Sequence, residues 1–227
     1  MSLKKNLLNL ALKKKNFSDI IKFYSKNDPS RVIFICGDKS LNYKQLDNKI
    51  NQVCNLFKKY NIRKNSPISI YLQNSIEYII FYFACIRFGA IVNPIPYGVD
   101  DNKMRYYLNL SRSILFISEK KKNIKNIKNL EILNSNDFEK KIKNFSLEFK
   151  NPEIKPKDIC AYYFSSGTTS KPKLIKYSNY AMVSCQKILF ESNFLEKFSS
   201  HLCILPLGHT ASLRYSIKNA ILGQGKV

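Results

Sequence analysis

The chain has 227 residues, of which 44% are hydrophobic, so it is long and apolar enough to bury a sizeable core. Its 38 Lys and Arg residues against 16 Asp and Glu residues give a net charge of +22, which is typical of proteins that bind anions. The lysines are scattered and only six arginines are present, so the pattern does not favour nucleic acid, and an anionic small molecule fits the charge equally well.

The first segment, residues 1–30, is predicted to be helical. Its apolar run over residues 7–12 contains Asn9, lacks a small-residue cleavage site and is followed by three lysines. That pattern is typical of a basic amphipathic helix rather than a signal peptide. The strongest apolar stretch, residues 79–86, is far shorter than the ~20 residues that a membrane span needs. We therefore expect a buried helix there and no transmembrane segment.

Strand and helix patterns alternate from about residue 31. Asn42 and Gln45 have the spacing of a capping box, and Gly89 and Gly223 stand where helices are expected to end. The β–α–β order predicts an α/β fold with largely parallel sheets and flanking helices. The predicted strands cover residues 31–36, 66–72, 90–95, 112–118, 160–164 and 201–207, with another beginning at 226, and the predicted helices cover 41–60, 74–89, 179–192 and 211–222.

Composition divides the chain further. We expect residues 31–158 to be the first α/β part of a large N-terminal domain and residues 159–227 to be a second part that carries a phosphate-binding loop. Residues 119–158 are rich in Lys and Asn, with short apolar pieces, and are interpreted as a surface excursion and linker.

The six cysteines are widely spaced, form no C-x-x-C pair and mostly have apolar neighbours, so we expect reduced thiols in a cytoplasmic protein.

A hydroxyl-rich loop follows the predicted strand at 160–164. Residues 165–170 are all Ser, Gly or Thr, and Lys171, Pro172 and Lys173 come next. Small residues expose backbone N–H groups, hydroxyls add donors, and the lysines add positive charge, so the loop suits a polyphosphate. A plain polar turn would explain Ser and Gly but not the lysines. The motifs G-x-x-x-x-G-K-[ST] and G-x-G-x-x-G are both absent, which leaves kinase and dehydrogenase functions without support.

The loop resembles the phosphate-loop signature of the acyl-adenylate-forming (AMP-binding) superfamily, which includes acyl-CoA synthetases, aryl-CoA ligases, luciferases and peptide-synthetase adenylation domains. Segments 40–46, 68–96 and 204–213 resemble three further family segments in the same order, so the resemblance covers about residues 30–227. The loop residues that match in register are Phe164, Ser165, Ser166, Gly167, Thr168, Thr169, Lys171, Pro172 and Lys173, with Ser178 on the Ser or Thr that follows.

Four positions depart from the family pattern. Ser170 and Leu174 replace two glycines of the signature, so the loop is expected to bend differently. Asn179 stands where the family often has histidine. Gly208 stands where an aromatic residue usually precedes the residue at His209, which is expected to widen the acyl pocket.

The resemblance implies a reaction in which a carboxylate attacks the α-phosphorus of ATP to give acyl-AMP and pyrophosphate, with Mg²⁺ as cofactor. In many relatives the acyl group then passes to a thiol, so CoA is the expected co-substrate. The residues implied to bind the ATP phosphates are Ser165, Ser166, Gly167, Thr168, Thr169, Lys171 and Lys173, of which Thr168 and Thr169 would also lie near the metal. The residues implied at the acyl pocket or its gate are Gly208, His209 and Thr210.

Later family elements are not found in this sequence: an aromatic-Gly-x-Thr-Glu segment, an aspartate for the ribose hydroxyls and a catalytic lysine near the C-terminus. We therefore expect the N-terminal half of such an enzyme, inactive and poorly stable alone, with no catalytic residue assigned within it. The expected partners are ATP and a small carboxylic acid, and no nucleic acid; neither the acid nor the oligomeric state follows from the sequence. Two alternatives stay open, a non-catalytic basic binding module on the same scaffold and a peptide-synthetase adenylation domain.

Overall fold

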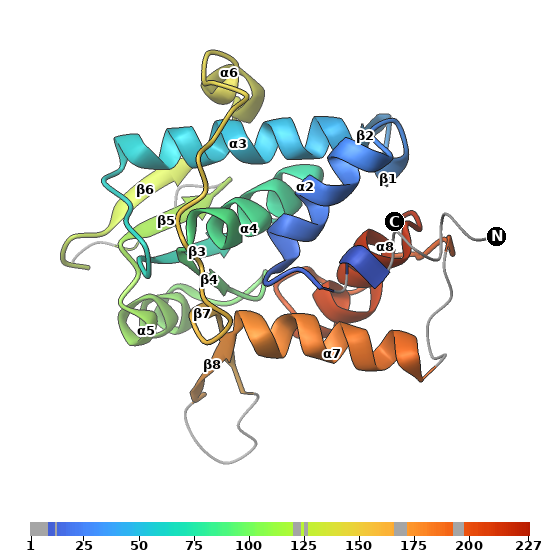
Figure 1. The fold of residues 1–227 in the computed structure, drawn as a ribbon. Coiled ribbons are helices and arrows are strands. Elements are labelled where there is room, and N and C mark those ends of the chain that lie inside the picture. The colour runs from blue at the N-terminus through green and yellow to red at the C-terminus, as the bar shows by residue number, and fades with distance from the viewer. Residues whose placement is uncertain (1–8, 12, 120–123, 125–126, 166–171, 193–197) are drawn as a thin grey trace.

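The structure is a computed structural model, shown in Figure 1, and it describes residues 9–11, 13–119, 124, 127–165, 172–192 and 198–227. Its centre is a six-stranded sheet with the order β6-β5-β3-β4-β7-β8. All neighbouring pairs are parallel except β7 and β8, which form an antiparallel hairpin. The strands are β3 (Pro67–Tyr71), β4 (Ile91–Pro94), β5 (Leu115–Ser118), β6 (Glu131–Asn134), β7 (Ile159–Phe164) and β8 (Leu174–Ser178).

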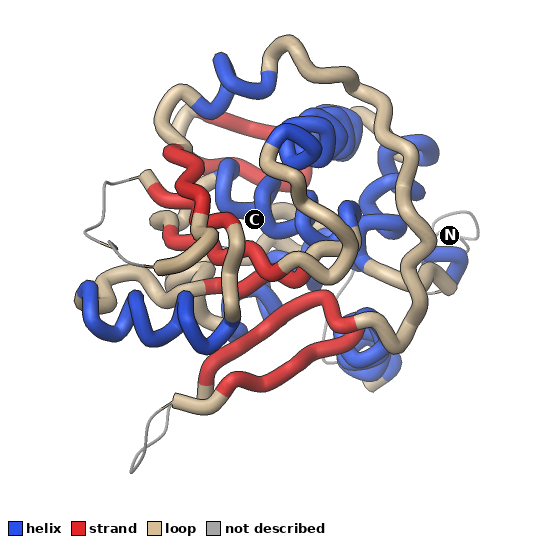
Figure 2. The backbone as a smooth tube through the Cα atoms, turned by 90° about the vertical axis from the view of Figure 1, so that its left-hand side faces the viewer, coloured by secondary structure: helices blue, strands red, loops and turns tan. Residues whose placement is uncertain are grey.

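Helices cover both faces of this sheet, and Figure 2 shows the layers from the side. On β5, Leu115 and Ile117 belong to a core cluster that contains the buried residues of α2, α3 and α4, whereas Phe116 faces the opposite way into a cluster with α5. This alternation confirms the predicted α/β fold with a mostly parallel sheet. The helices are α2 (Phe17–Asn27), α3 (Tyr43–Lys59), α4 (Ile76–Phe88), α5 (Asp101–Ser111), α6 (Phe138–Ile142), α7 (Asn179–Glu191) and a terminal helix made of the π-helical turn η1 (Ser212–Ile217) and α8 (Lys218–Gly223).

The predicted helix ends are confirmed for the two long buried helices. Asn42 and Gln45 form a reciprocal capping box at the start of α3, with N···O distances of 2.8 and 3.0 Å. α4 begins after Ser75, whose hydroxyl accepts the Tyr78 N–H, and ends at Gly89, which has a φ of 75°. That left-handed conformation favours glycine because a Cβ would be strained there.

The region at residues 119–158 contributes more than a linker. Its strand β6 forms the edge of the main sheet, parallel to β5, and its helix α6 packs against α3. Gln52 on α3 donates from Nε2 to the Ile142 carbonyl at 3.0 Å, which fixes the returning chain. Strand β6 was not predicted. It lies at the edge of the sheet with Glu131 and Ile132 exposed, so its sequence lacks the continuous apolar run of a buried strand. The division into segments 1–30, 31–158 and 159–227 stays a prediction.

The predicted strand at 201–207 is wrong. Within the described residues, the backbone pairing beside it consists of one parallel bridge, between Ser200 and Lys226, and a strand needs a neighbour to satisfy its backbone groups. The chain turns away after this bridge and leaves Leu202 81% and Ile204 79% exposed. Helix α5 and strand β8 were not predicted either: most exposed positions of α5 are polar, and β8 is an edge strand whose exposed residues, Ile175 and Lys176, do not give a buried-strand pattern.

A second, smaller sheet packs beside α3 and α4. Strands β1 (Val32–Cys36) and β2 (Lys39–Asn42) form an antiparallel pair. The Val227 N–H donates to the Ile33 carbonyl at 2.9 Å, and the Ile35 N–H donates to the Val227 carbonyl at 2.7 Å. Val227 therefore lies beside β1 and exchanges backbone hydrogen bonds with it, but residues 226–227 form one isolated bridge, Ser200 with Lys226, and not the strand predicted to begin at residue 226.

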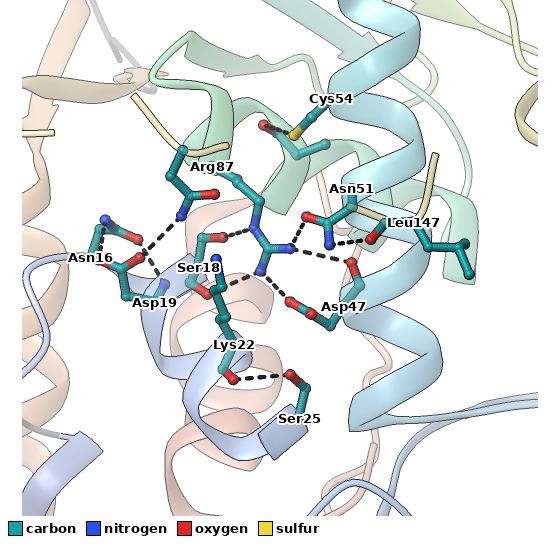
Figure 3. A network of polar contacts seen from close by, with 12 residues as sticks. Asn16, Ser18, Asp19, Lys22, Ser25, Asp47, Asn51, Cys54, Arg87 and Leu147 are labelled. Carbon is teal, nitrogen blue, oxygen red and sulfur yellow. Dashed lines mark hydrogen bonds and ion pairs between the residues drawn. The ribbon is translucent and has the colours of Figure 1, made fainter. Parts of the chain in front are cut away.

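A buried guanidinium joins the three helices that cover one face of the sheet (Figure 3). Arg87 on α4 is fully buried and donates from Nε to the Ser18 hydroxyl at 2.6 Å and from Nη1 to Asn51 Oδ1 at 2.6 Å. Its Nη2 lies 2.7 Å from Asp47 Oδ1, an ion pair whose angles are not those of a hydrogen bond. Asn51 donates in turn to the Leu147 carbonyl at 2.7 Å, so the network also fixes the chain after α6.

We expect Asp47→Ala to lower the free energy of unfolding by about 3–5 kcal/mol, because it leaves the Arg87 charge buried without its carboxylate. The measurement is urea denaturation of the purified chain. Glu191→Ala, which removes the exposed ion pair with Lys187, is the matched control and should change the free energy by less than about 1 kcal/mol. Equal effects of the two substitutions would show that Arg87 does not depend on Asp47.

Candidate functional site

The hairpin of β7 and β8 carries the predicted phosphate loop. Figure 2 shows this hairpin along the lower edge of the molecule. Its strands pair in register up to Phe164 and Leu174. Beyond them the Ser165 N–H donates to the Lys173 carbonyl at 3.0 Å, and the Lys173 N–H donates to the Ser165 hydroxyl at 3.1 Å. These two reciprocal bonds close the base of the loop.

Most of the predicted phosphate-binding residues lie outside the described residues. Ser166, Gly167, Thr168, Thr169 and Lys171 belong to this group, so their roles, including the metal role of the two threonines, stay predictions. Among the described residues no group of three or more His, Cys, Asp or Glu side chains could hold a metal ion.

Helix α5 supports the base of the loop from the face opposite α4. The Tyr106 hydroxyl donates to the Pro172 carbonyl at 2.9 Å, and the Tyr107 ring stacks on Phe164 with 4.0 Å between centroids. Sequence reasoning missed both tyrosines because α5 itself was not predicted. The adjacent pair of tyrosines before Leu108 was the available signal, since aromatic residues in a polar helix commonly mark the side that packs.

The end of the hairpin leads directly into α7. Ser178 matches the Ser or Thr that follows the family's loop signature. Here it is the N-cap of α7, and its Oγ accepts the Ala181 N–H at 3.1 Å. Asn179 donates from both its backbone N–H and its side chain to the Asp158 carbonyl, at 3.0 and 3.2 Å. The residue that departs from the family's histidine therefore ties the start of α7 to the start of β7.

The three residues implied at the acyl pocket follow the exposed segment at 201–207. Gly208 is buried, and a Cβ there would lie 2.7 Å from the Ile95 carbonyl oxygen. The close approach of the two backbones is therefore enough to explain why this position is glycine. His209 is exposed, and its Nδ1 lies 3.3 Å from the Ala211 nitrogen, whose N–H it accepts. Thr210 is exposed and lines a cavity.

That cavity, of about 330 Å³, lies between the β7–β8 hairpin, α7 and the terminal helix. Thr210 is the only one of the implied pocket residues that lines it, whereas Gly208 and His209 do not. Sequence reasoning did not anticipate the remaining lining, because it joins residues of three elements. The side chains that matter below are Tyr163, Tyr177, Gln186, Arg214 and Lys218.

Two buried tyrosines hold the terminal helix in place. Tyr24 on α2 donates to the Leu222 carbonyl at 2.9 Å, and Tyr43 on α3 donates to the Ile221 carbonyl at 2.7 Å. The last carbonyls of a helix have no partner within it, so these two bonds satisfy acceptors that would otherwise be buried and unpaired. Burial raises the pKa of Tyr43 well above its usual value, which keeps its hydroxyl a donor.

Comparison with known proteins now decides the family. The family model described as "AMP-binding enzyme" matches residues 23–227. The chain belongs to this family of adenylate-forming enzymes. The AMP-binding match spans the hairpin, α7 and the terminal helix, and thus includes both the phosphate loop and the cavity.

Curated relatives of this AMP-binding chain fall into two groups. It is 26% identical over 161 residues to tyrocidine synthase 3 of Brevibacillus parabrevis. The matched segment covers 70% of this chain and 2% of that protein. It is 26% identical over 106 residues to a medium/long-chain-fatty-acid–CoA/3-oxocholest-4-en-26-oate–CoA ligase of Mycobacterium tuberculosis, which covers 47% of this chain and 19% of the ligase. The chain therefore spans only a fraction of the length of these relatives.

Solved structures share its fold. The Klebsiella oxytoca NpsA N-terminal subdomain in complex with 3-hydroxyanthranilyl-AMSN matches with a TM-score of 0.82 and 20% identity, over 95% of this chain and 54% of that one. The anthranilate CoA ligase AuaEII in complex with anthranoyl-AMP matches with a TM-score of 0.86 and 19% identity, over 93% of this chain and 43% of the ligase. The AMP-binding chain thus has the fold of about half of each relative.

Ser165→Ala should accelerate hydrogen exchange at the Lys173 amide about fivefold, because a hydrogen bond contributes about 1 kcal/mol and the Lys173 N–H would lose its acceptor. NMR exchange rates of the purified chain measure this. Ser192→Ala, at the exposed end of α7, is the control and should leave the Lys173 rate unchanged. An unchanged Lys173 rate in Ser165→Ala would mean that the base of the loop is not closed as described.

Proposed function

We propose that the protein containing this chain activates a carboxylic acid with ATP, forming acyl-AMP and releasing pyrophosphate, and then passes the acyl group to a thiol such as CoA. Membership of the adenylate-forming family supports the first step, and the curated match to a CoA ligase supports the second. The observation that carries the proposal is the hydroxyl- and lysine-rich sequence at the end of the β7–β8 hairpin, whose base is closed by Ser165 and Lys173. Because the chain spans about half of its solved relatives, the activity is proposed for the whole protein.

The loop supplies electrostatic stabilisation rather than a general acid or base. Negative charge builds on the departing pyrophosphate as the α–β bond of ATP breaks, and donors aimed at that charge lower the barrier. The Ser165 oxygen accepts the Lys173 N–H, which leaves its hydroxyl proton to donate to a phosphate oxygen. Lys173 is exposed and makes no ion pair with any described residue, so its ammonium is available to a phosphate.

The remaining loop residues fit the same ligand by their chemistry. Ser166, Thr168 and Thr169 would add hydroxyl donors, Gly167 an unobstructed backbone N–H, and Lys171 a second cation. The hydroxyl oxygens of the two threonines are hard donors of the kind that Mg²⁺ accepts when it is bound mainly through phosphates. Bound Mg²⁺ would neutralise charge on the phosphates.

A peptide-synthetase adenylation domain is the second candidate. The match to tyrocidine synthase 3 extends over 161 residues of this chain, against 106 for the CoA ligase, and gives this candidate specific support. The two functions share the adenylation step and differ in the acceptor. Acyl transfer from the enzyme to CoA, compared with transfer to a carrier domain encoded beside it, separates them.

We place the protein in the cytoplasm. All six cysteines are free, which fits a reducing compartment. No helix in the described part of the chain is long and apolar enough to cross a membrane.

ATP–pyrophosphate exchange with a panel of carboxylic acids tests the function on the complete protein. Thr168→Val and Lys173→Ala should each slow exchange about 30- to 1,000-fold, as expected if each removes ~2–4 kcal/mol of transition-state stabilisation. Lys176→Ala, an exposed lysine on the same strand as Leu174, is the matched control and should retain the wild-type rate. Wild-type rates in both loop variants would mean that the loop is an ordinary turn. No exchange with any acid, together with tight and salt-sensitive RNA binding, would favour the basic binding module instead.

A further inference from the structure

The cavity beside the hairpin contains a buried cation that no carboxylate compensates. Lys218, at the start of α8, is only 5% exposed, and no Asp or Glu among the described residues forms an ion pair with it. Burial lowers the pKa of Lys218 to about 8. Its charge is partly offset by the Tyr82 ring, whose centroid lies 5.9 Å from Nζ, but a ring satisfies none of the three N–H donors by a full hydrogen bond.

A second cation lies one helical turn away. Arg214 lines the same cavity, and its buried Nε has no hydrogen-bond partner. Residues four apart on a helix share a face, so Arg214 and Lys218 present their positive charges to the same space. Two cations this close repel each other, and the arrangement costs stability unless an anion joins them.

The opposite wall, on α7, has a fixed amide with an unused acceptor. Gln186 is 1% exposed and donates from Nε2 to the Arg214 carbonyl at 2.7 Å and to Asn219 Oδ1 at 3.2 Å. These bonds fix its orientation, and Oε1 is left buried without a partner. The unpaired Arg214 Nε–H indicates that a ligand acceptor supplies the missing contact, while the Gln186 amide holds the Arg214 backbone in place.

The rest of the cavity is suited to an organic body rather than to a simple ion. Tyr163 and Tyr177 form its hairpin wall, and Met182 extends the apolar surface on α7. Tyr163 is two residues before Ser165, so the hairpin wall leads directly to the base of the phosphate loop. A volume of about 330 Å³ holds a small organic acid.

We propose that this cavity binds the far end of a dicarboxylic acid, holding its second carboxylate between Arg214 and Lys218 while the first carboxylate lies toward Ser165, at the described base of the hairpin loop. The inference rests on the proposed function and names its substrate class. The distal carboxylate would accept hydrogen bonds from both cations and would compensate the buried charge on Lys218. The apolar chain of the diacid would separate it from the carboxyl group that is activated.

The folding energetics support a ligand site. A lysine whose pKa is lower in the folded chain than in the unfolded one binds its proton less tightly once folded, so it destabilises the fold at every pH below its unfolded value. Lys218→Met should therefore raise the thermal midpoint at pH 7. The substitution would stabilise the chain while removing its binding function, a combination that a lysine with a structural role would not give.

Calorimetric titration of the complete protein with glutarate and adipate, and with the monoamide of each, tests the proposal. The wild type should bind each diacid at least about tenfold more tightly than its monoamide, the preference expected of one additional charged hydrogen-bonded contact. Lys218→Met and Arg214→Gln should abolish most of that preference. Lys176→Met, with an exposed lysine on the outer face of β8, should retain it.

The pH dependence supplies an independent readout. The groups that face Lys218 are Cys160, Cys185, Arg214, Tyr163, Tyr177 and the Tyr82 ring, and none of these is a carboxylic acid. Diacid affinity should therefore fall about tenfold per pH unit above pH 8, as the free lysine loses its proton, and this fall should be absent in Lys218→Met.

The outcomes separate this inference from the proposed function. Diacid preference that survives Lys218→Met and Arg214→Gln, or equal binding of diacids and monoamides, overturns the inference. Pyrophosphate exchange with monocarboxylic acids only would agree with the proposed function and would contradict the inference that the substrate is a dicarboxylic acid. Selective diacid binding in a protein that shows no exchange would retain the cavity and reject the adenylation function.

Discussion

The buried guanidinium of Arg87 is the constraint on which the arrangement of this chain depends. It lies where α2, α3 and α4 meet, and its hydrogen bonds to Ser18 and Asn51 and its ion pair with Asp47 engage all three helices. A charge in the interior must be compensated, so the three helices can adopt few other relative positions without losing one of these contacts. α2 and α3 in turn position the terminal helix, since each donates a tyrosine hydroxyl to one of its last carbonyls. The cavity wall is thereby fixed from the far side of the core.

Two buried cations in the same chain have opposite surroundings, and the contrast points to where function lies. Arg87 has a carboxylate and four hydrogen bonds and contributes to a rigid scaffold. Among the described residues Lys218 faces an aromatic ring and no carboxylate, and it lines a cavity walled by the β7–β8 hairpin. Groups that destabilise a fold are commonly found where a ligand supplies the missing interaction. The hairpin joins the two parts of the site, because its loop is suited to the phosphates of ATP and its inner face forms a wall of the cavity.

Local signals in the sequence predicted the elements whose stability is local. The capping box of α3 and the left-handed glycine after α4 are short-range features, and both were placed correctly. Residues 201–207 read as a strand because they are apolar, but strand formation depends on partners elsewhere in the chain. The order of residues predicts the phosphate loop, and that assignment stays a prediction, whereas the cavity was missed, since it brings together Gln186 and Arg214 from different helices. No periodicity encodes a contact of that kind.

A crystal structure of the complete protein with an acyl sulfamoyl adenosine made from a dicarboxylic acid would show whether the hairpin and the terminal helix form one acid-activating site. The adenosine-linked sulfamate is expected to lie against the hairpin loop closed by Ser165 and Lys173. The distal carboxylate is expected within about 3 Å of the Lys218 ammonium, the distance of a charge-assisted hydrogen bond. A ligand bound away from the hairpin, or a distal carboxylate directed into solvent with the cavity empty, would contradict a single acid-activating site.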